Sequence, residues 1–97
     1  MKIKFLDQFG ETHEVTGWKP FVMFGETFAA HKSTRVADTW DVAHVGTGAT
    51  LGARARATTR DRAIEFARIM LTGEGETKVL ATIARARASN EERRKRA

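Results

Sequence analysis

The sequence of 97 residues lacks cysteine and tyrosine and contains a single proline. Without cysteine the chain can form no disulfide, no thiolate zinc site and no cysteine nucleophile, so its stability depends on packing. No apolar run approaches the roughly 18 residues of a membrane-spanning helix, and no long apolar segment follows Met1–Phe5. We therefore expect no membrane insertion, no secretory signal and a cytoplasmic location.

Side chains for nucleophilic catalysis are few. Ser33 and Ser89 are the two serines, and neither lies in a nucleophile elbow or another activating frame. The glycine-rich segment 46–52 reads G-x-G-x-x-x-G, one residue too long for a dinucleotide-binding loop, and it leads into a predicted strand instead of a helix. The sequence therefore predicts a protein that is not an enzyme and has no cofactor.

The three histidines are the remaining candidates for catalysis or metal binding. His13, His31 and His44 fall on different predicted strands, and none has a partner at helical or H-x-H spacing. Asp41 or Glu14 could join a histidine in three dimensions. The simpler interpretation is that these are partly exposed strand histidines, with His44 at the rim of the sheet, and we predict no metal site.

The net charge of +5 is concentrated at the end of the chain. Residues 85–97 hold six basic and two acidic side chains, whereas residues 1–84 hold 11 and 10, so the tail carries four of the five net charges. We predict one α+β domain over residues 1–84 and a basic C-terminal tail, helical or disordered, over residues 85–97.

The first half of the chain predicts strands. Lys2–Leu6 alternates between apolar and polar residues, and Thr12–Thr16 returns after a turn signal, which indicates a hairpin. Glycines at 46 and 48 supply a later reversal. The predicted strand segments are 2–6, 12–16, 21–24, 27–31, 39–44 and 50–56. We expect them to form an antiparallel sheet of about five short strands.

Two helices are predicted to follow the sheet. Thr58 or Thr59 is a suitable N-cap, and apolar residues recur at helical spacing through residue 71 before Gly73 and Gly75. This helix, 59–72, is expected to pack on the sheet. A second helix begins near residue 76, and from Ser89 onward it is expected to fray or to be ordered only by a partner, because its apolar surface is small.

Large aromatic residues divide into core and surface. Phe9 and Trp18 flank turns and are expected to be exposed, and an exposed aromatic residue on a small domain favours a binding surface. The predicted core aromatics are Phe5, Phe21, Phe28, Trp40 and Phe66.

Basic residues form two candidate binding features. Arg54 and Arg56 would share one strand face, with Arg60 and Arg62 just beyond, and such a row suits a nucleic-acid backbone. The alternative is a solvated strand face. The tail could hold phosphates, contact an anionic surface or form a basic helix against an acidic protein, or it could simply be a solubilising end. Its basic residues are Arg85, Arg87, Arg93, Arg94, Lys95 and Arg96.

Residues 40–67 carry a family resemblance. A strand that opens with Trp40, a glycine turn, a returning strand and then T-x-x-x-A-x-x-F-A over 59–67 resemble the strand–strand–helix end of the arm-binding domains of phage integrases and related AP2-like modules. The resemblance implies a sheet in the DNA major groove, with Arg54 and Arg56 facing bases or phosphates. It covers about a third of the chain.

The whole chain, alanine- and arginine-rich with a basic end, is also similar to accessory proteins of phages from GC-rich hosts. That similarity implies a non-enzymatic protein, located in a bacterial cytoplasm, that binds a host protein. The alternative is a nucleic-acid-binding protein, with DNA or RNA as the partner. A homodimer through the C-terminal helix is a further possibility that the sequence leaves open.

Overall fold

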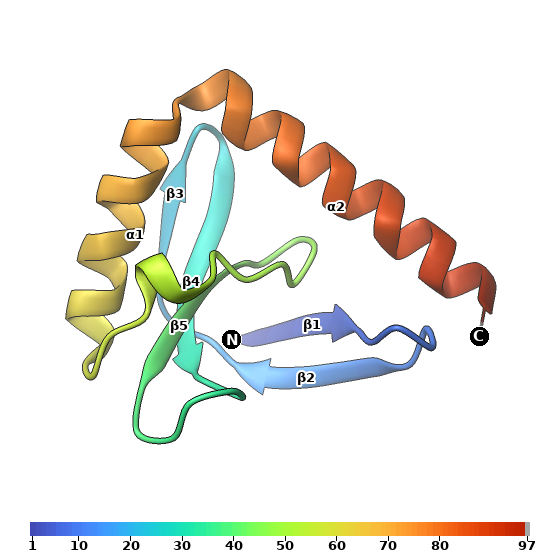
Figure 1. Cartoon of the computed structure of the whole chain (residues 1–97), viewed down its shortest axis with the longest axis horizontal. Coiled ribbons are helices and arrows are strands. Elements are labelled where there is room, and N and C mark those ends of the chain that lie inside the picture. Colours follow the sequence, from blue (N-terminus) through green and yellow to red (C-terminus); the bar gives the residue numbers. More distant parts are fainter. Residues whose placement is uncertain (97) are drawn as a thin grey trace.

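The computed structural model describes residues 1–96 and has the predicted α+β class (Figure 1). Ala97, the last residue of the predicted tail, lies outside the described residues. The elements are β1 (Lys2–Leu6), β2 (Thr12–Thr16), β3 (Trp18–Met23), β4 (Glu26–Lys32), β5 (Trp40–His44), the 3₁₀ helix η1 (Ala53–Ala55), α1 (Arg60–Glu74) and α2 (Glu76–Arg96). Within residues 1–96, neither helix is long and apolar enough to cross a membrane.

The five strands form two sheets, not the single sheet that was predicted. β1 and β2 pair as an antiparallel hairpin, and β3, β4 and β5 form a separate antiparallel sheet in that order. The chain passes from one sheet to the other at the buried Gly17, where an added Cβ would lie 3.0 Å from Ile3 Cδ1 and from Met1 Cγ. A residue with a side chain would therefore crowd the side chains of Ile3 and Met1 at this crossing.

The three-stranded sheet is buried on both faces because each is covered by a different element. Phe28 and Val42 face α1, whereas Ala29 and Ala43 alternate to the other face and pack against Ile3 of the hairpin. In Figure 1, α1 and the β1–β2 hairpin accordingly lie on either side of β4 and β5. The molecule thus has three layers, with the small alanines permitting the hairpin to approach closely.

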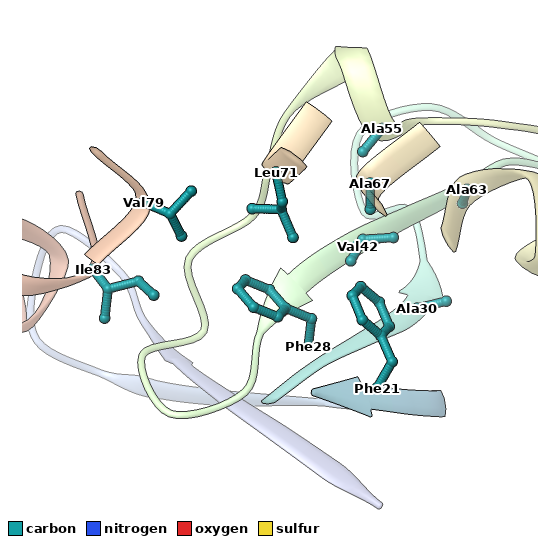
Figure 2. Packing of buried hydrophobic residues seen from close by; sticks show 10 residues of the cluster. All are labelled: Phe21, Phe28, Ala30, Val42, Ala55, Ala63, Ala67, Leu71, Val79 and Ile83. Atoms are coloured by element: carbon teal, nitrogen blue, oxygen red, sulfur yellow. The ribbon is translucent and has the colours of Figure 1, made fainter. Parts of the chain in front are cut away.

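The larger core lies between the sheet and the helices (Figure 2). Phe28 and Leu71 are among its largest fully buried side chains. Phe21 and Phe28 are buried as predicted, but the other predicted core aromatics, Phe5, Trp40 and Phe66, are only half-buried. The buried members are Phe21, Phe28, Ala30, Val42, Ala55, Ala63, Ala67, Leu71, Val79 and Ile83.

The predicted strand over residues 50–56 is wrong. The chain reverses at Gly48 and runs beside β5, but it touches β5 only at isolated bridges between Ala43 and Thr50 and between Trp40 and Ala57. Between the bridges, η1 folds inward so that Ala55 is fully buried. The alternating Arg and Ala residues therefore belong to a tight turn, and this turn places Ala55 in the core.

Helix α1 begins and ends close to where its sequence signals place it. The Thr59 hydroxyl accepts a hydrogen bond from the Arg62 amide at 3.2 Å, which caps the first turn. The helix continues through Gly73 to Glu74, two residues beyond the prediction, and ends at Gly75 with φ of +87°. It packs on the sheet as expected.

Helix α2 continues to Arg96, so the predicted fraying from Ser89 does not occur. Its first half is held by Val79 and Ile83, both buried in the core. Its second half is held by polar contacts, in which Asn90 Nδ2 donates to the Thr47 carbonyl at 3.0 Å and Arg93 Nη1 donates to the Leu6 carbonyl at 3.1 Å. The helix therefore runs unbroken across the predicted boundary at residue 85.

Candidate functional site

The most exposed large aromatic group on the three-stranded sheet is Trp18, at the start of the edge strand β3. Its relative exposure is 44%, in agreement with the prediction. The guanidinium carbon of Arg60 lies 4.6 Å from the centroid of the Trp18 ring and 5.3 Å from that of Trp40. Arg60 is therefore stacked between two tryptophans, at a distance at which a cation is attracted to each ring.

This stack follows directly from the strand order. Trp18 pairs with Ala30 of β4, and Trp40 opens β5 opposite Lys32 of the same strand, so the two tryptophans flank β4 near one end of the sheet. Arg60 is the first residue of α1, whose N-terminus lies over that end. The stack thus brings together Trp18 and Arg60, two predicted binding residues from distant parts of the sequence.

An open hollow of about 400 Å³ adjoins the Trp18 side chain. Lys32 is its charged lining residue, and this lysine forms no ion pair with any residue in the described part of the chain. The lining consists of Val15, Thr16, Trp18, Lys32, Ser33 and Thr34. We call these residues, together with Arg60 and Trp40, the Trp18 surface.

The backbone of β3 is irregular beside this surface. The pairing register shifts between Trp18 and Phe21, Lys19 has a φ of +49°, and the intervening Pro20 has no amide hydrogen. Lys19 Nζ bonds the Asp61 carboxylate of α1, and this hydrogen bond holds the pKa of Asp61 below its usual range. A bulge and a proline protect an edge strand from pairing with another strand, so this edge presents side chains and not a regular row of backbone donors and acceptors.

The four arginines of the predicted nucleic-acid row are dispersed. Arg54 bonds Glu74 at 3.2 Å, and Arg56 bonds the buried Asp41 at 2.8 Å. Arg62 lies 3.8 Å from Glu65, and Arg60 belongs to the tryptophan stack. Because residues 50–56 do not form a strand, Arg54 and Arg56 do not share a face, and no guanidinium row exists among them.

Most basic residues of the predicted tail bond either to residues outside α2 or to other residues of α2. Arg87 bonds Glu26 at 3.0 Å, and Arg96 donates to the Gln8 carbonyl at 3.4 Å, in addition to the contact of Arg93 with Leu6. Arg94 and Lys95 pair within the helix with Glu91 and Glu92, and Arg85 donates to Thr82. The contacts of Arg87, Arg93 and Arg96 attach the tail to the body.

His44 forms a buried polar network that the sequence analysis did not identify. The side chain is 3% exposed, so His44 does not lie at the rim of the sheet. Nδ1 accepts from the Thr47 amide at 3.2 Å and lies 2.8 Å from the Thr47 hydroxyl, while Nε2 lies 2.7 Å from Glu26 Oε1. An amide can only donate, so Nδ1 is the acceptor, and the Nε2–H group donates a hydrogen bond to Glu26 Oε1.

The His44 network also fixes α2. Glu26 accepts from Arg87 of α2, and the Thr47 carbonyl accepts from Asn90 one turn later. The hydrogen bond from His44, assisted by the charge of Arg87, holds the pKa of Glu26 below its usual range. A hydroxyl, an imidazole and a carboxylate are thus adjacent, but Thr47 is 5% exposed and its oxygen accepts from the Ala49 amide, so this group is suited to joining elements.

One group of potential metal ligands lies at the turn between β1 and β2. Ligand atoms of Asp7, Glu11 and His13 all lie within 4.8 Å of one another. Asp7 already accepts from the Phe9 and Glu11 amides and lies 2.9 Å from His13 Nε2. The bond with His13 is the main cause that lowers the Asp7 pKa. These hydrogen bonds stabilise the turn, and they explain why the three side chains lie close together.

Comparison with known proteins gives no further guidance, because no family model, curated protein or solved structure matches this chain.

Proposed function

We propose that this chain is a non-enzymatic binding protein, an accessory factor of a phage or mobile element, which binds a protein of the bacterial host in the cytoplasm through the Trp18 surface. The observation that carries the proposal is the placement of Trp18, which is 44% exposed between the stacked Arg60 and an open hollow. Tryptophan and arginine are the residue types that most often dominate the binding energy of protein interfaces.

The geometry of the stack favours binding by side chains that are already in place. Arg60 lies against two rings, so its long side chain has less freedom to lose when a partner binds. The cation–π attraction of an exposed pair is worth about 0.5–1 kcal/mol, enough to bias the guanidinium toward this position. A partner would then bury the exposed part of the indole.

The positive charge of the Trp18 surface indicates the chemistry of the partner. Arg60 stacks on Trp18 and Lys32 lines the hollow beside it, and neither forms an ion pair with a residue in the range 1–96. A complementary surface therefore has an apolar group for the indole, flanked by carboxylates. Nucleic-acid binding through the arginine row has less support, because Arg54, Arg56 and Arg62 already contact carboxylates.

The test is a capture experiment from a bacterial lysate with the immobilised 97-residue chain. Trp18→Ala is compared with Phe9→Ala, which removes another exposed aromatic residue, 67% exposed and distant from the Trp18 surface at the β1–β2 turn. We expect a protein that is retained by the unmodified chain and by Phe9→Ala and is lost with Trp18→Ala. Retention by all three, or capture of no protein at all, would contradict the proposal.

A further inference from the structure

Two adjoining cavities flank the contact between the second half of α2 and the hairpin. Their volumes are about 310 Å³ and 290 Å³. They share Phe5, Leu6, Thr47 and Asn90, so they lie on either side of the hydrogen bond from Asn90 to the Thr47 carbonyl. Figure 1 shows the arrangement of the ribbons, with α2 descending from the end of α1 toward the β1–β2 turn.

Every charged side chain that lines these cavities is basic. Arg35 and Arg93 line the first, and Lys2, Lys4 and Arg94 line the second. No carboxylate lines either cavity, although the chain contains 12 acidic residues against 17 basic ones. Five cations from three separate segments therefore line two adjoining cavities, an arrangement whose electrostatic field favours a bound polyanion.

Most of these cations are available to a ligand. Arg94 pairs with Glu91 at 3.0 Å, but both side chains are largely exposed, so the pair is weak. Lys2 and Arg35 form no ion pair with another residue of the described chain. The Lys4–Glu14 distance is 4.0 Å and both side chains are largely exposed, so that pair is weak. Arg93 uses one Nη1 hydrogen bond to the Leu6 carbonyl, which orients the guanidinium and leaves most of its five N–H donors for an anion.

One aromatic residue is common to both cavities, with its side chain on the opposite face of β1 from Lys2 and Lys4. Phe5 lines both cavities and is half-buried, and its ring is stacked on that of His13 with centroids 5.3 Å apart. Proteins that bind single-stranded nucleic acid combine a basic groove for the backbone with aromatic rings on which bases stack. An acidic peptide without aromatic side chains would use the cations but has no aromatic base to stack on the ring.

From these observations we infer a second binding site, the basic cleft, which takes the phosphate backbone of a single-stranded nucleic acid. The backbone phosphates contact Arg35 and Arg93 on one side of Asn90 and Lys2, Lys4 and Arg94 on the other, and a base lies over Phe5. This site is separate from the Trp18 surface and from the arginine row, and it gives Arg93 and Arg94 of the tail a role that depends on the folded helix.

The test uses a fluorescein-labelled 12-nucleotide oligodeoxythymidylate and fluorescence anisotropy at low salt with the full chain. The double variant Lys2→Glu/Arg35→Glu reverses two cations that have no partner within the protein, so the fold should be retained, as circular dichroism can verify. Arg62→Glu together with Arg68→Glu makes the same charge change on α1. We expect the first variant to weaken binding at least tenfold and the second to change it less than threefold.

Salt dependence gives a second readout. Removal of two phosphate contacts should flatten the slope of log K against log salt by about 1.4, at about 0.7 per phosphate of a single strand. Trp18→Ala should leave oligonucleotide binding unchanged, so this test and that of the proposed host-protein contact fail independently. The inference is overturned if no oligonucleotide binds, if the α1 variant weakens binding equally, or if a 12-base-pair duplex or polyglutamate binds as tightly as the single strand.

Discussion

The imidazole of His44 lies 2.7 Å from Glu26 Oε1, and this contact joins β5, β4 and α2 in one buried network. The same Glu26 oxygen accepts a hydrogen bond from Arg87 of α2, while the other ring nitrogen of His44, Nδ1, lies within hydrogen-bond distance of the Thr47 hydroxyl. A helix that the sequence suggests is loosely attached is therefore fixed by polar groups inside the protein. The stability of the fold should depend on His44 accordingly.

His44→Ala should lower the free energy of unfolding by about 1–3 kcal/mol, because it leaves the Thr47 amide without its partner and Glu26 with Arg87 alone. Urea denaturation followed by circular dichroism measures the change. His13→Ala is the matched control, since that imidazole is exposed and bonds a surface carboxylate. A change within about 0.5 kcal/mol for the control is expected. Equal effects of both variants would contradict the role assigned to His44.

The pH dependence of stability should reflect Glu26. Its folded-state pKa lies below its usual value of 4.5, so the ionised carboxylate stabilises the protein above that pH. The stabilisation is lost as the pH falls from about 4.5 through the lower folded-state pKa. Protonation of Glu26 in the folded protein weakens its contacts with His44 and Arg87. Glu26→Gln should reduce the acid slope of unfolding free energy, and an unaltered slope would contradict this assignment.

Two glycines should respond to substitution in opposite directions. Gly48 has a φ of +74°, and an added Cβ would lie 2.3 Å from the Lys4 carbonyl, so Gly48→Ala should destabilise by at least about 2 kcal/mol. Gly73 is helical with no atom within 4 Å of its Cβ position, so Gly73→Ala should stabilise by about 0.5–1 kcal/mol. Thermal unfolding of the two variants checks both signs, and a destabilised Gly73→Ala would argue against helix at that residue.

The order of α2 beyond Ser89 is testable by hydrogen exchange. Asn90→Ala and Arg93→Ala each remove a bond to a loop or strand carbonyl and should accelerate amide exchange over residues 89–96. Lys95→Ala, which removes only a 3.8 Å pair within the helix, should have little effect. Exchange that is already fast in the unmodified chain and is unaffected by Asn90→Ala would show that these contacts do not hold the helix.

Local signals in the sequence predict much of the fold. Alternation identifies the hairpin from Lys2 to Thr16, and the hydroxyl of Thr59 marks the start of α1 within a residue. The same alternation gives a wrong prediction at 50–56, where Arg and Ala residues alternate as in a strand but form no strand. Gly52, with φ of +82°, instead turns the chain into η1, and the absence of a side chain larger than a methyl group at residue 55 lets that turn enter the core.

The contacts that build the sites are harder to predict because they join residues far apart in the chain. Arg60 meets Trp18 across 42 positions, and Arg93 meets Leu6 across 87, as a consequence of sheet order and helix direction. The exposure of Trp18 was predicted from its neighbouring turn, but nothing local pairs it with Arg60. The basic residues of the tail suggest an anion site, whereas the shape of the basic cleft that we infer depends on the hydrogen bond from Asn90 of α2 to the Thr47 carbonyl.

The most direct test of the proposed function is the dissociation constant of the captured host protein, measured by isothermal titration calorimetry against the unmodified chain, Trp18→Ala and Phe9→Ala. A residue at the energetic centre of an interface contributes at least about 2 kcal/mol, which corresponds to about a 30-fold change. We predict that Trp18→Ala raises the dissociation constant by at least that factor and that Phe9→Ala changes it less than twofold. An unchanged dissociation constant for Trp18→Ala would contradict the proposal that this side chain forms the binding surface.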